Sequence, residues 1–299
     1  MAYKMKTSLG SKLFDIVNYS FMILFCFTVL LPIWDMIVVS FSPASEVSYL
    51  RTNLWPKEWT LDAYEYCLNS SKIYNAFFVS VCRTILGMAY HLLLCSMAAY
   101  ALTRSQMPLR KTITFLFLVP MFFTGGLIPV YMNIKMLGLL DNFWVYVLPC
   151  GFSIYNTIII RNYFYSIDSA MEEAASIDGA SRFRIFFSII LPLSKPVLAT
   201  VALWQMVAHW NTWFDNLIYV RKDSLLTLQM LLRKMTVETE LLASDARSYA
   251  MMNKQVAMDF NSDTIKAATT ILVILPIVMV YPFLQKYFVK GIMVGAVKG

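Results

Sequence analysis

Six long apolar segments divide this chain and limit what it can fold into. Each holds about 20 or more residues, the length that an α-helix needs to cross the hydrocarbon core of a bilayer. The sequence therefore predicts an all-α, polytopic membrane protein with six transmembrane helices. The segments lie at about residues 14–41, 73–102, 112–137, 143–165, 197–220 and 265–289.

The composition agrees with a protein that lies almost wholly in the bilayer. Hydrophobic residues make up 59% of the chain and charged residues only 14%, whereas soluble domains carry about 25% charged residues. The longest polar connections, 43–72 and 221–264, are too short to form a separate soluble domain. We therefore expect a single transmembrane domain over residues 1–299. Its first apolar segment is too long for the core of a signal peptide and is expected to remain as an anchor.

The net charge of +7 indicates membrane orientation and not nucleic-acid binding. Basic residues gather at both termini and in alternate connections, whereas the connection at 43–72 is nearly balanced in charge. Cytoplasmic connections carry the excess of lysine and arginine, so we expect both termini in the cytoplasm. The basic residues that set this orientation are Lys4, Lys6, Lys12, Arg104, Arg110, Lys111, Arg161, Arg182, Arg184, Lys195, Lys286, Lys290 and Lys298.

The sequence argues against three other functions: an enzyme, an ATPase and an ion-coupled transporter. The chain has two histidines, and its five cysteines show neither CxxC nor Cys/His ligand spacing, so we expect no metal site and no catalytic residue. No GxxxxGK[ST] motif occurs, so ATP must be bound by another subunit. An ion-coupled secondary transporter needs carboxylates within its spans, but Asp15, Asp35 and Asp215 lie near span ends. The ion-coupled transporter is disfavoured by this argument but stays open as an alternative.

The connection at 161–196 is expected to form a helical hairpin. Ser169 can cap a first helix, and Glu172 three positions later completes a capping box. Gly179 can take the left-handed conformation that ends a helix. Ser181 can cap a second helix, which continues toward the fifth apolar segment. On these features alone the hairpin would be a solvated, well-capped loop.

The same connection carries a distinctive pattern from Glu173 to Pro192: Glu-Ala-Ala, three residues, Gly, nine residues and Ile-x-Leu-Pro. It resembles the EAA loop of permease subunits in binding-protein-dependent ABC importers. The resemblance implies the type I importer permease fold in a bacterial cytoplasmic (inner) membrane, and a loop that docks into a groove of a separate ATPase. It also implies the docking residues: Glu173 for a polar contact, Ala174 and Ala175 for packing, Gly179 for the bend, and Glu172, Asp178 and Arg182 beside them.

Other segments resemble the carbohydrate branch of these importers. They are residues 55–64, 193–200 and 210–214, and the tail 290–299, which is similar to the tail of the six-span maltose-importer permease. Residues 125–129 resemble a subgroup that includes the alginate importer. The resemblance implies a sugar or oligosaccharide substrate, a second homologous permease, two ATPase subunits that hold ATP and Mg²⁺, and a soluble sugar-binding protein. This chain itself is expected to bind no cofactor, and a permease for a non-sugar solute stays open as an alternative.

The fifth span carries residues suited to sugar recognition. Sugars stack their apolar faces on aromatic rings and form hydrogen bonds with polar side chains. Positions 209, 213 and 216 would share one face of a continuous helix. An aromatic belt at the membrane surface is the alternative explanation for the aromatic residues. The candidates are His209, Trp210, Asn211, Trp213 and Asn216.

Arg83 is the most unusual residue within a span. A charge there must face a cavity or a partner charge, or extend toward the membrane surface. If it lines the pathway, it could pair with the carboxylate of an acidic sugar. Tyr131 and Asn156 are further candidates for the pathway. Glycines and a proline within residues 123–129 predict a break in the third span, and residues 225–235 could form a short amphipathic helix.

Overall fold

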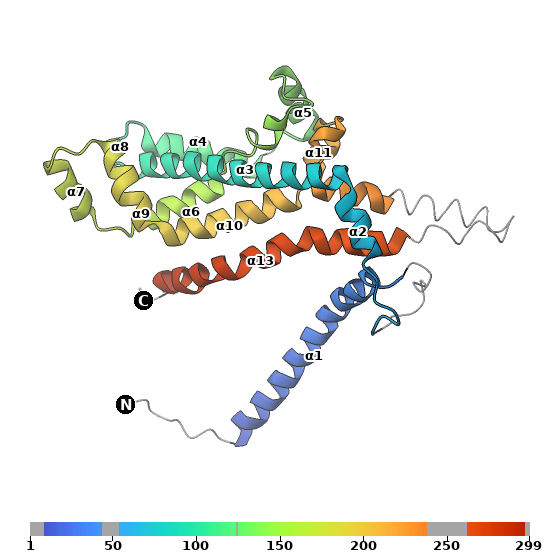
Figure 1. Ribbon diagram of the computed structural model, residues 1–299. Helices are drawn as coiled ribbons and strands as arrows, with labels where there is room; N and C mark the ends of the chain where they lie inside the picture. The colour runs from blue at the N-terminus through green and yellow to red at the C-terminus, as the bar shows by residue number, and fades with distance from the viewer. Residues whose placement is uncertain (1–8, 44–53, 124, 238–261, 297–299) are drawn as a thin grey trace. The chain divides into compact units, whose positions relative to one another are not determined.

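The computed structural model describes residues 9–43, 54–123, 125–237 and 262–296. Within these residues the chain forms helices and turns and contains no strand, so the predicted all-α class is confirmed (Figure 1). The chain divides into two compact units. They are Met1–Asn69 with Met235–Leu272, and Ser70–Lys234 with Val273–Gly299.

The first unit holds the first apolar segment as one continuous helix. Its helices are α1 (Leu9–Ser40), α2 (Asp62–Asn69) and the first part of α13 (Ser262–Ala296). Along α1 most apolar side chains are exposed, as expected of a helix that lipid surrounds. A contact of 2.8 Å between Ser40 Oγ and Tyr64 Oη joins α1 to α2. The buried Cys67 of α2 places its Sγ 3.4 Å from Thr269 Oγ1 of α13.

The second unit is built around α3, which packs against α6 and α10 (Figure 1). Small residues such as Ser80 and Ala99 lie on the buried face of α3 and let neighbouring helices approach closely. A methyl group added at Gly87 would lie 2.6 Å from the ring of His209, so this position has no room for a side chain. The elements are α3 (Ser71–Thr103), α4 (Arg110–Phe122), α5 (Leu127–Met136), η2 (Phe143–Tyr146), α6 (Ile154–Phe164), α7 (Ser169–Ile177), α8 (Arg182–Ile185), η3 (Phe186–Ile190), α9 (Leu191–Leu193), α10 (Lys195–Asn211), α11 (Phe214–Tyr219), η4 (Asp223–Leu225) and the later part of α13.

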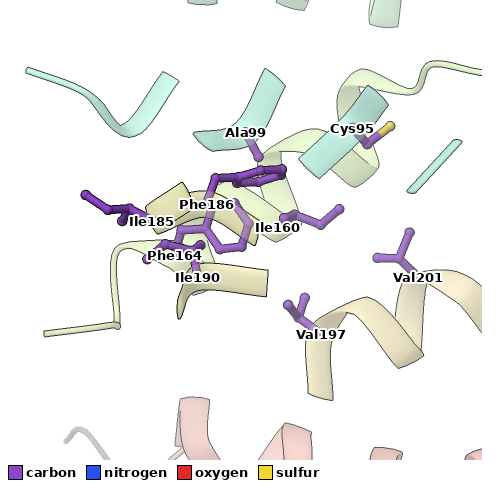
Figure 2. Packing of buried hydrophobic residues seen from close by; sticks show 9 residues of the cluster. All are labelled: Cys95, Ala99, Ile160, Phe164, Ile185, Phe186, Ile190, Val197 and Val201. Carbon is purple, nitrogen blue, oxygen red and sulfur yellow. The ribbon is translucent and has the colours of Figure 1, made fainter. Parts of the chain in front are cut away.

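A hydrophobic core joins the 161–196 hairpin to the long helices of this unit. In Figure 2 the ring of Phe186 lies among Ala99, Ile160 and Phe164, which come from α3 and α6. The same ring lies 5.1 Å from that of Tyr100. Because such interiors are close-packed, the hairpin is held firmly against these helices. The core consists of Cys95, Ala99, Ile160, Phe164, Ile185, Phe186, Ile190, Val197 and Val201.

Three helices, α1, α3 and α13, are each long and apolar enough to cross a membrane. Two further crossings are possible if each of two bent helix pairs forms one span. The first pair is α4 and α5, bent by 115°, and the second is the run from α8 to α9 together with α10, bent by 80°. The first, second and sixth predicted spans are therefore continuous helices. The third is interrupted, as the glycines and proline within 123–129 predict.

The fourth predicted span, 143–165, is not one helix. It begins with the 3₁₀ turn η2, where Asn142 Oδ1 accepts a hydrogen bond of 3.1 Å from Trp144 N. Its α-helical part, α6, has only 11 residues, which is too short to cross a bilayer alone. Pro149 lacks a backbone donor and Ser153 caps a new helix, which explains the interruption.

Candidate functional site

The predicted helical hairpin forms, with Gly179 at its turn. Gly179 has φ +77°, and an added Cβ there would meet no atom within 4 Å. The need for glycine is therefore conformational and not steric. Ser181 caps the second helix as predicted, because its Oγ accepts a hydrogen bond of 3.3 Å from Arg184 N.

The cap of the first helix differs from the prediction. Asp168, not Ser169, is the N-cap of α7, and its Oδ1 accepts a hydrogen bond of 3.0 Å from Ala170 N. Ser169 is the first helical residue, so the expected capping box with Glu172 is wrong. An aspartate one position earlier caps equally well, and this leaves the carboxylate of Glu172 available for another partner.

That partner is Arg104, the residue that follows α3. Arg104 Nη2 donates a hydrogen bond of 2.7 Å to Glu172 Oε1, and the two side chains form an ion pair. The guanidinium lies 4.1 Å from the centre of the Tyr100 ring. Burial opposes the charge of Arg104, but the hydrogen bond to Glu172 and the attraction of Tyr100 and Glu172 outweigh it and raise the arginine pKa. The hairpin is thereby tied to the end of α3.

A second polar contact ties the other half of the hairpin to the same region. Arg182 Nη2 donates to Gln106 Oε1. A cavity of about 720 Å³ lies between the hairpin and the end of α3. Polar side chains supply much of its wall, among them Thr103, Arg104, Gln106, Glu172, Glu173 and Arg182.

Part of the hairpin is open to solvent. Glu173, which also borders this cavity, is exposed, as are Ala174 and Asp178. Ile177 is 86% exposed. Ala175 differs from its neighbours, because it is half-buried and packs against the hydrophobic core of its own chain.

Arg83 pairs with Asp215 in the second unit. Its side chain is 1% exposed, that of Asp215 is 15% exposed, and the two form an ion pair. Arg83 Nη1 also donates hydrogen bonds of 3.2 Å to Asp215 Oδ1 and 3.1 Å to Thr212 O. The guanidinium lies 4.5 Å from the centre of the Tyr146 ring. The sequence leaves three possibilities open for Arg83: a cavity, a partner charge or the membrane surface. The structure shows the second, a partner charge from the same chain.

The fifth predicted span, 197–220, is broken, and this places Asp215 inward. Helix α10 ends at Asn211, Thr212 is extended, and α11 begins at Phe214. The expectation that 209, 213 and 216 share one helical face is therefore wrong. Asp215 lies in the first turn of α11, where its carboxylate reaches Arg83 although the sequence places it near a span end.

Four other pathway candidates are buried in packing or in hydrogen bonds. Asn216 is fully buried, and its Nδ2 donates to Tyr146 Oη and, at 3.2 Å, to Leu225 O. Trp210 Nε1 donates a hydrogen bond of 2.9 Å to Val273 O. His209 is 4% exposed and lies against Gly87 of α3.

The fourth of these candidates, Asn156, belongs to a buried polar group on α3 and α6. Its Nδ2 lies 2.9 Å from His91 Nε2. The other ring nitrogen of His91, Nδ1, lies 2.9 Å from Cys150 O. These contacts account for the burial of the Asn156 and His91 side chains without a bound ligand.

The remaining candidates can be reached from solvent. Asn211 is exposed and Trp213 is partly exposed, while the ring of Tyr131 stacks at 6.1 Å on that of Tyr219. Residues 228–237 are helical, so a helix occurs where residues 225–235 predict one. From it Gln229 Nε2 donates a hydrogen bond of 3.3 Å to Asn211 Oδ1.

The same short helix places Arg233 over Trp213, with 3.8 Å between the guanidinium carbon and the ring centre. Sequence reasoning named neither Gln229 nor Arg233. Their helical spacing of four residues is a signal that they share a face, but nothing local shows which span they meet. Within the part of the chain that the structure describes, no three His, Cys, Asp or Glu side chains gather as metal ligands.

Comparison with known proteins identifies the family. Residues 91–214 match the family described as "Binding-protein-dependent transport system inner membrane component". The chain is 37% identical to the polygalacturonan/rhamnogalacturonan transport system permease protein YtcP of Bacillus subtilis, over 97% of this chain and 99% of that protein.

Solved structures agree with this relationship. A chain from the crystal structure of a bacterial ABC transporter involved in the import of the acidic polysaccharide alginate aligns with a TM-score of 0.84 and 29% identity, covering 94% of this chain and 98% of that one. A second chain, from a bacterial alginate ABC transporter in complex with an alginate pentasaccharide-bound periplasmic protein, has a TM-score of 0.57 at 13% identity, covering 90% and 93%, and supports the fold alone. The chain thus belongs to the binding-protein-dependent transport system inner membrane components, which are membrane transport subunits and not enzymes.

Proposed function

We propose that this chain is a permease subunit of an ATP-driven importer for oligosaccharides, and that the 161–196 hairpin couples it to an ATPase. One observation carries the coupling role: the hairpin is anchored to its own chain through Phe186 and the Arg104–Glu172 pair, yet Glu173, Ala174 and Asp178 remain exposed. The names of the relatives, which transport polygalacturonan or alginate, support the sugar substrate.

The proposed assembly contains a second homologous permease, two ATPase subunits and a soluble sugar-binding protein. ATP and Mg²⁺ belong to the ATPase subunits, because this chain has no phosphate-binding motif of the GxxxxGK[ST] type. The hairpin and both termini face the cytoplasm. The excess of basic residues in the connections on that side supports this orientation.

The contacts of the hairpin suggest how a movement of the ATPase reaches the pathway. Closure of the ATPase subunits around ATP shifts the hairpin. The shift passes through Phe186 and the core around it, and through the Arg104–Glu172 ion pair, to α3 and α10. Helix α3 carries Arg83, which holds Asp215 of α11 at the far end of α10. The movement therefore alternates access to the pathway between the two sides of the membrane.

The proposal assigns different roles to the hairpin residues. Glu173, Ala174 and Asp178 contact the ATPase directly, and Gly179 sets the angle between α7 and α8. Glu172 and Arg182 hold the hairpin to α3 and to the turn that follows it. Ala175 supports the docking surface from behind, since it packs on the core of this chain.

The decisive experiment is to purify the complex with Glu173→Lys or Gly179→Pro and to measure both ATPase co-purification and ATP-dependent sugar uptake. Glu58→Lys, an exposed charge reversal in the other unit, is the matched control. We expect the two hairpin variants, but not the control, to lose most of the ATPase while they still insert into the membrane. Retention of the ATPase, or uptake that persists without ATP and collapses with an ionophore, would favour an ion-coupled transporter instead.

A further inference from the structure

A cluster of polar and aromatic side chains lies at the end of α10 that is opposite to the hairpin. We name it the outer cluster: Asn211, Trp213, Gln229 and Arg233. Helix α10 has 17 residues, which corresponds to about 25 Å at 1.5 Å per residue. Figure 1 shows α7 and α11 at opposite ends of this unit. If the hairpin contacts the ATPase, the outer cluster therefore faces the side from which a solute arrives.

The outer cluster is formed by two segments that meet there. The guanidinium carbon of Arg233 lies 3.8 Å from the centre of the Trp213 ring. Gln229, one helical turn earlier, donates its hydrogen bond of 3.3 Å to Asn211. Asn211 and Arg233 are exposed, and Gln229 and Trp213 are partly exposed. All four side chains are thus open to a ligand.

The charge of Arg233 has no carboxylate partner among the described residues. None of the described ion pairs includes it. Residues 205–237 contain two carboxylates, of which Asp215 pairs with Arg83 and Asp223 lies 3.5 Å from Lys234. Among the described residues, the guanidinium of Arg233 therefore lies beside an aromatic face without a paired carboxylate.

We infer that the outer cluster binds a uronic acid unit of an acidic oligosaccharide as it enters the permease, an inference that rests on the proposed function. An aromatic ring packs on the apolar face of a sugar, a guanidinium binds a carboxylate through two parallel hydrogen bonds, and side-chain amides donate to and accept from hydroxyls. A phosphate of a lipid headgroup would use the guanidinium alone. The ring and the two amides favour the sugar.

The outer cluster also fits this role better than Arg83 does. Arg83 is 1% exposed and already holds Asp215, so an incoming carboxylate would have to displace a buried one. Removing one partner from a buried ion pair leaves an uncompensated charge. Arg233 needs no such displacement, because its guanidinium is exposed.

The test uses the complete importer with its binding protein in proteoliposomes and trigalacturonate as the probe. Arg233→Met keeps an unbranched side chain that can pack on Trp213 but removes the charge. Lys234→Met, the adjacent basic residue, is the matched control. We expect Arg233→Met to lower trigalacturonate uptake per assembled complex by about tenfold or more, the effect of losing a charge-assisted hydrogen-bonded pair. Arg233→Lys should recover only part of it, and Lys234→Met should stay within about twofold of the unchanged protein.

Three results would overturn the inference. The first is uptake by Arg233→Met within twofold of the unchanged complex. The second is a loss of uptake that is explained by a lower yield of assembled complex, because the contact would then be structural. A loss of uptake that disappears in vesicles without anionic lipid counts in the same way, because the contact would then involve lipid. The third is failure of the unchanged complex to import trigalacturonate. In that case, ATPase co-purification and ATP-dependent uptake of the neutral probe maltotriose decide separately whether the proposed function still holds.

Discussion

Arg83 and Asp215 form a buried ion pair although 132 positions separate them in the chain. The pair joins α3 to α11, the helix that follows the break after α10. Burial of two charges is tolerated when each compensates the other. Here Thr212 O and the Tyr146 ring supply further contacts to the guanidinium, while its Nε has no hydrogen-bond partner among the described residues. The pair therefore fixes the geometry of the broken span.

Removal of one member of this pair should destabilise the protein strongly. Asp215→Asn leaves Arg83 buried without a counter-charge, and we expect a loss of about 3–5 kcal/mol in the free energy of unfolding. The double variant Arg83→Met/Asp215→Leu removes both charges and should regain most of that loss. Thermal denaturation of the purified complex in detergent measures both effects. A double variant as unstable as Asp215→Asn would show that the pair does not act through charge compensation.

The Arg104–Glu172 pair should matter for coupling more than for stability. Both side chains are partly exposed, at 28% and 17%, so the pair stabilises the fold by about 1 kcal/mol or less. Arg104→Glu places two like charges together and should lower ATP-dependent uptake about two- to fivefold. The exchange Arg104→Glu/Glu172→Arg should restore uptake. Lys111→Glu, an exposed basic residue just beyond the same turn, controls for a general effect of charge.

Gly87 should tolerate no larger residue. A Cβ at this position would lie 2.6 Å from the His209 ring, and such overpacking costs about 1–3 kcal/mol. Gly87→Ala should therefore reduce the yield and the melting temperature of the complex, and Gly87→Ala/His209→Ala should recover them. Gly125→Ala is the control, because its Cβ would meet only Pro129, at 3.7 Å. Equal losses in both single variants would contradict this steric account.

Asp141 should hold the start of the segment that leads to the outer cluster. Its Oδ1 accepts hydrogen bonds from Arg221 N and from Lys222 N, the latter at 3.2 Å, and these bonds lower the pKa of the carboxyl below its usual value. A lowered pKa means that the stabilisation is complete above the unfolded pKa of about 3.9 and is lost as the pH falls through the folded value. At pH 7 we expect Asp141→Ala to speed hydrogen exchange at the amides of residues 221 and 222, and Asp141→Asn to do so less. Unchanged exchange in Asp141→Ala would remove this role.

Local sequence was sufficient for the helical hairpin and its turn. The left-handed glycine and the Ser181 cap depend on residues within one turn of each other, and both occur as predicted. The N-cap of α7 was missed by one position, because Asp168 and Ser169 are equally good caps and the choice depends on where Glu172 finds its partner. That partner, Arg104, lies 68 positions away.

The sequence by itself determined that this chain is helical, crosses a membrane and carries a helical hairpin, because apolar length, turn chemistry and capping are local properties. It also required that Arg83 face a cavity, meet a partner charge or extend toward the membrane surface, since a lone charge in a span is costly. Only the tertiary structure decided that Asp215 supplies a partner charge, that Ala175 faces the core and that Arg233 reaches Trp213. These contacts join segments far apart in the chain, and their free energy depends on which surfaces the fold brings together.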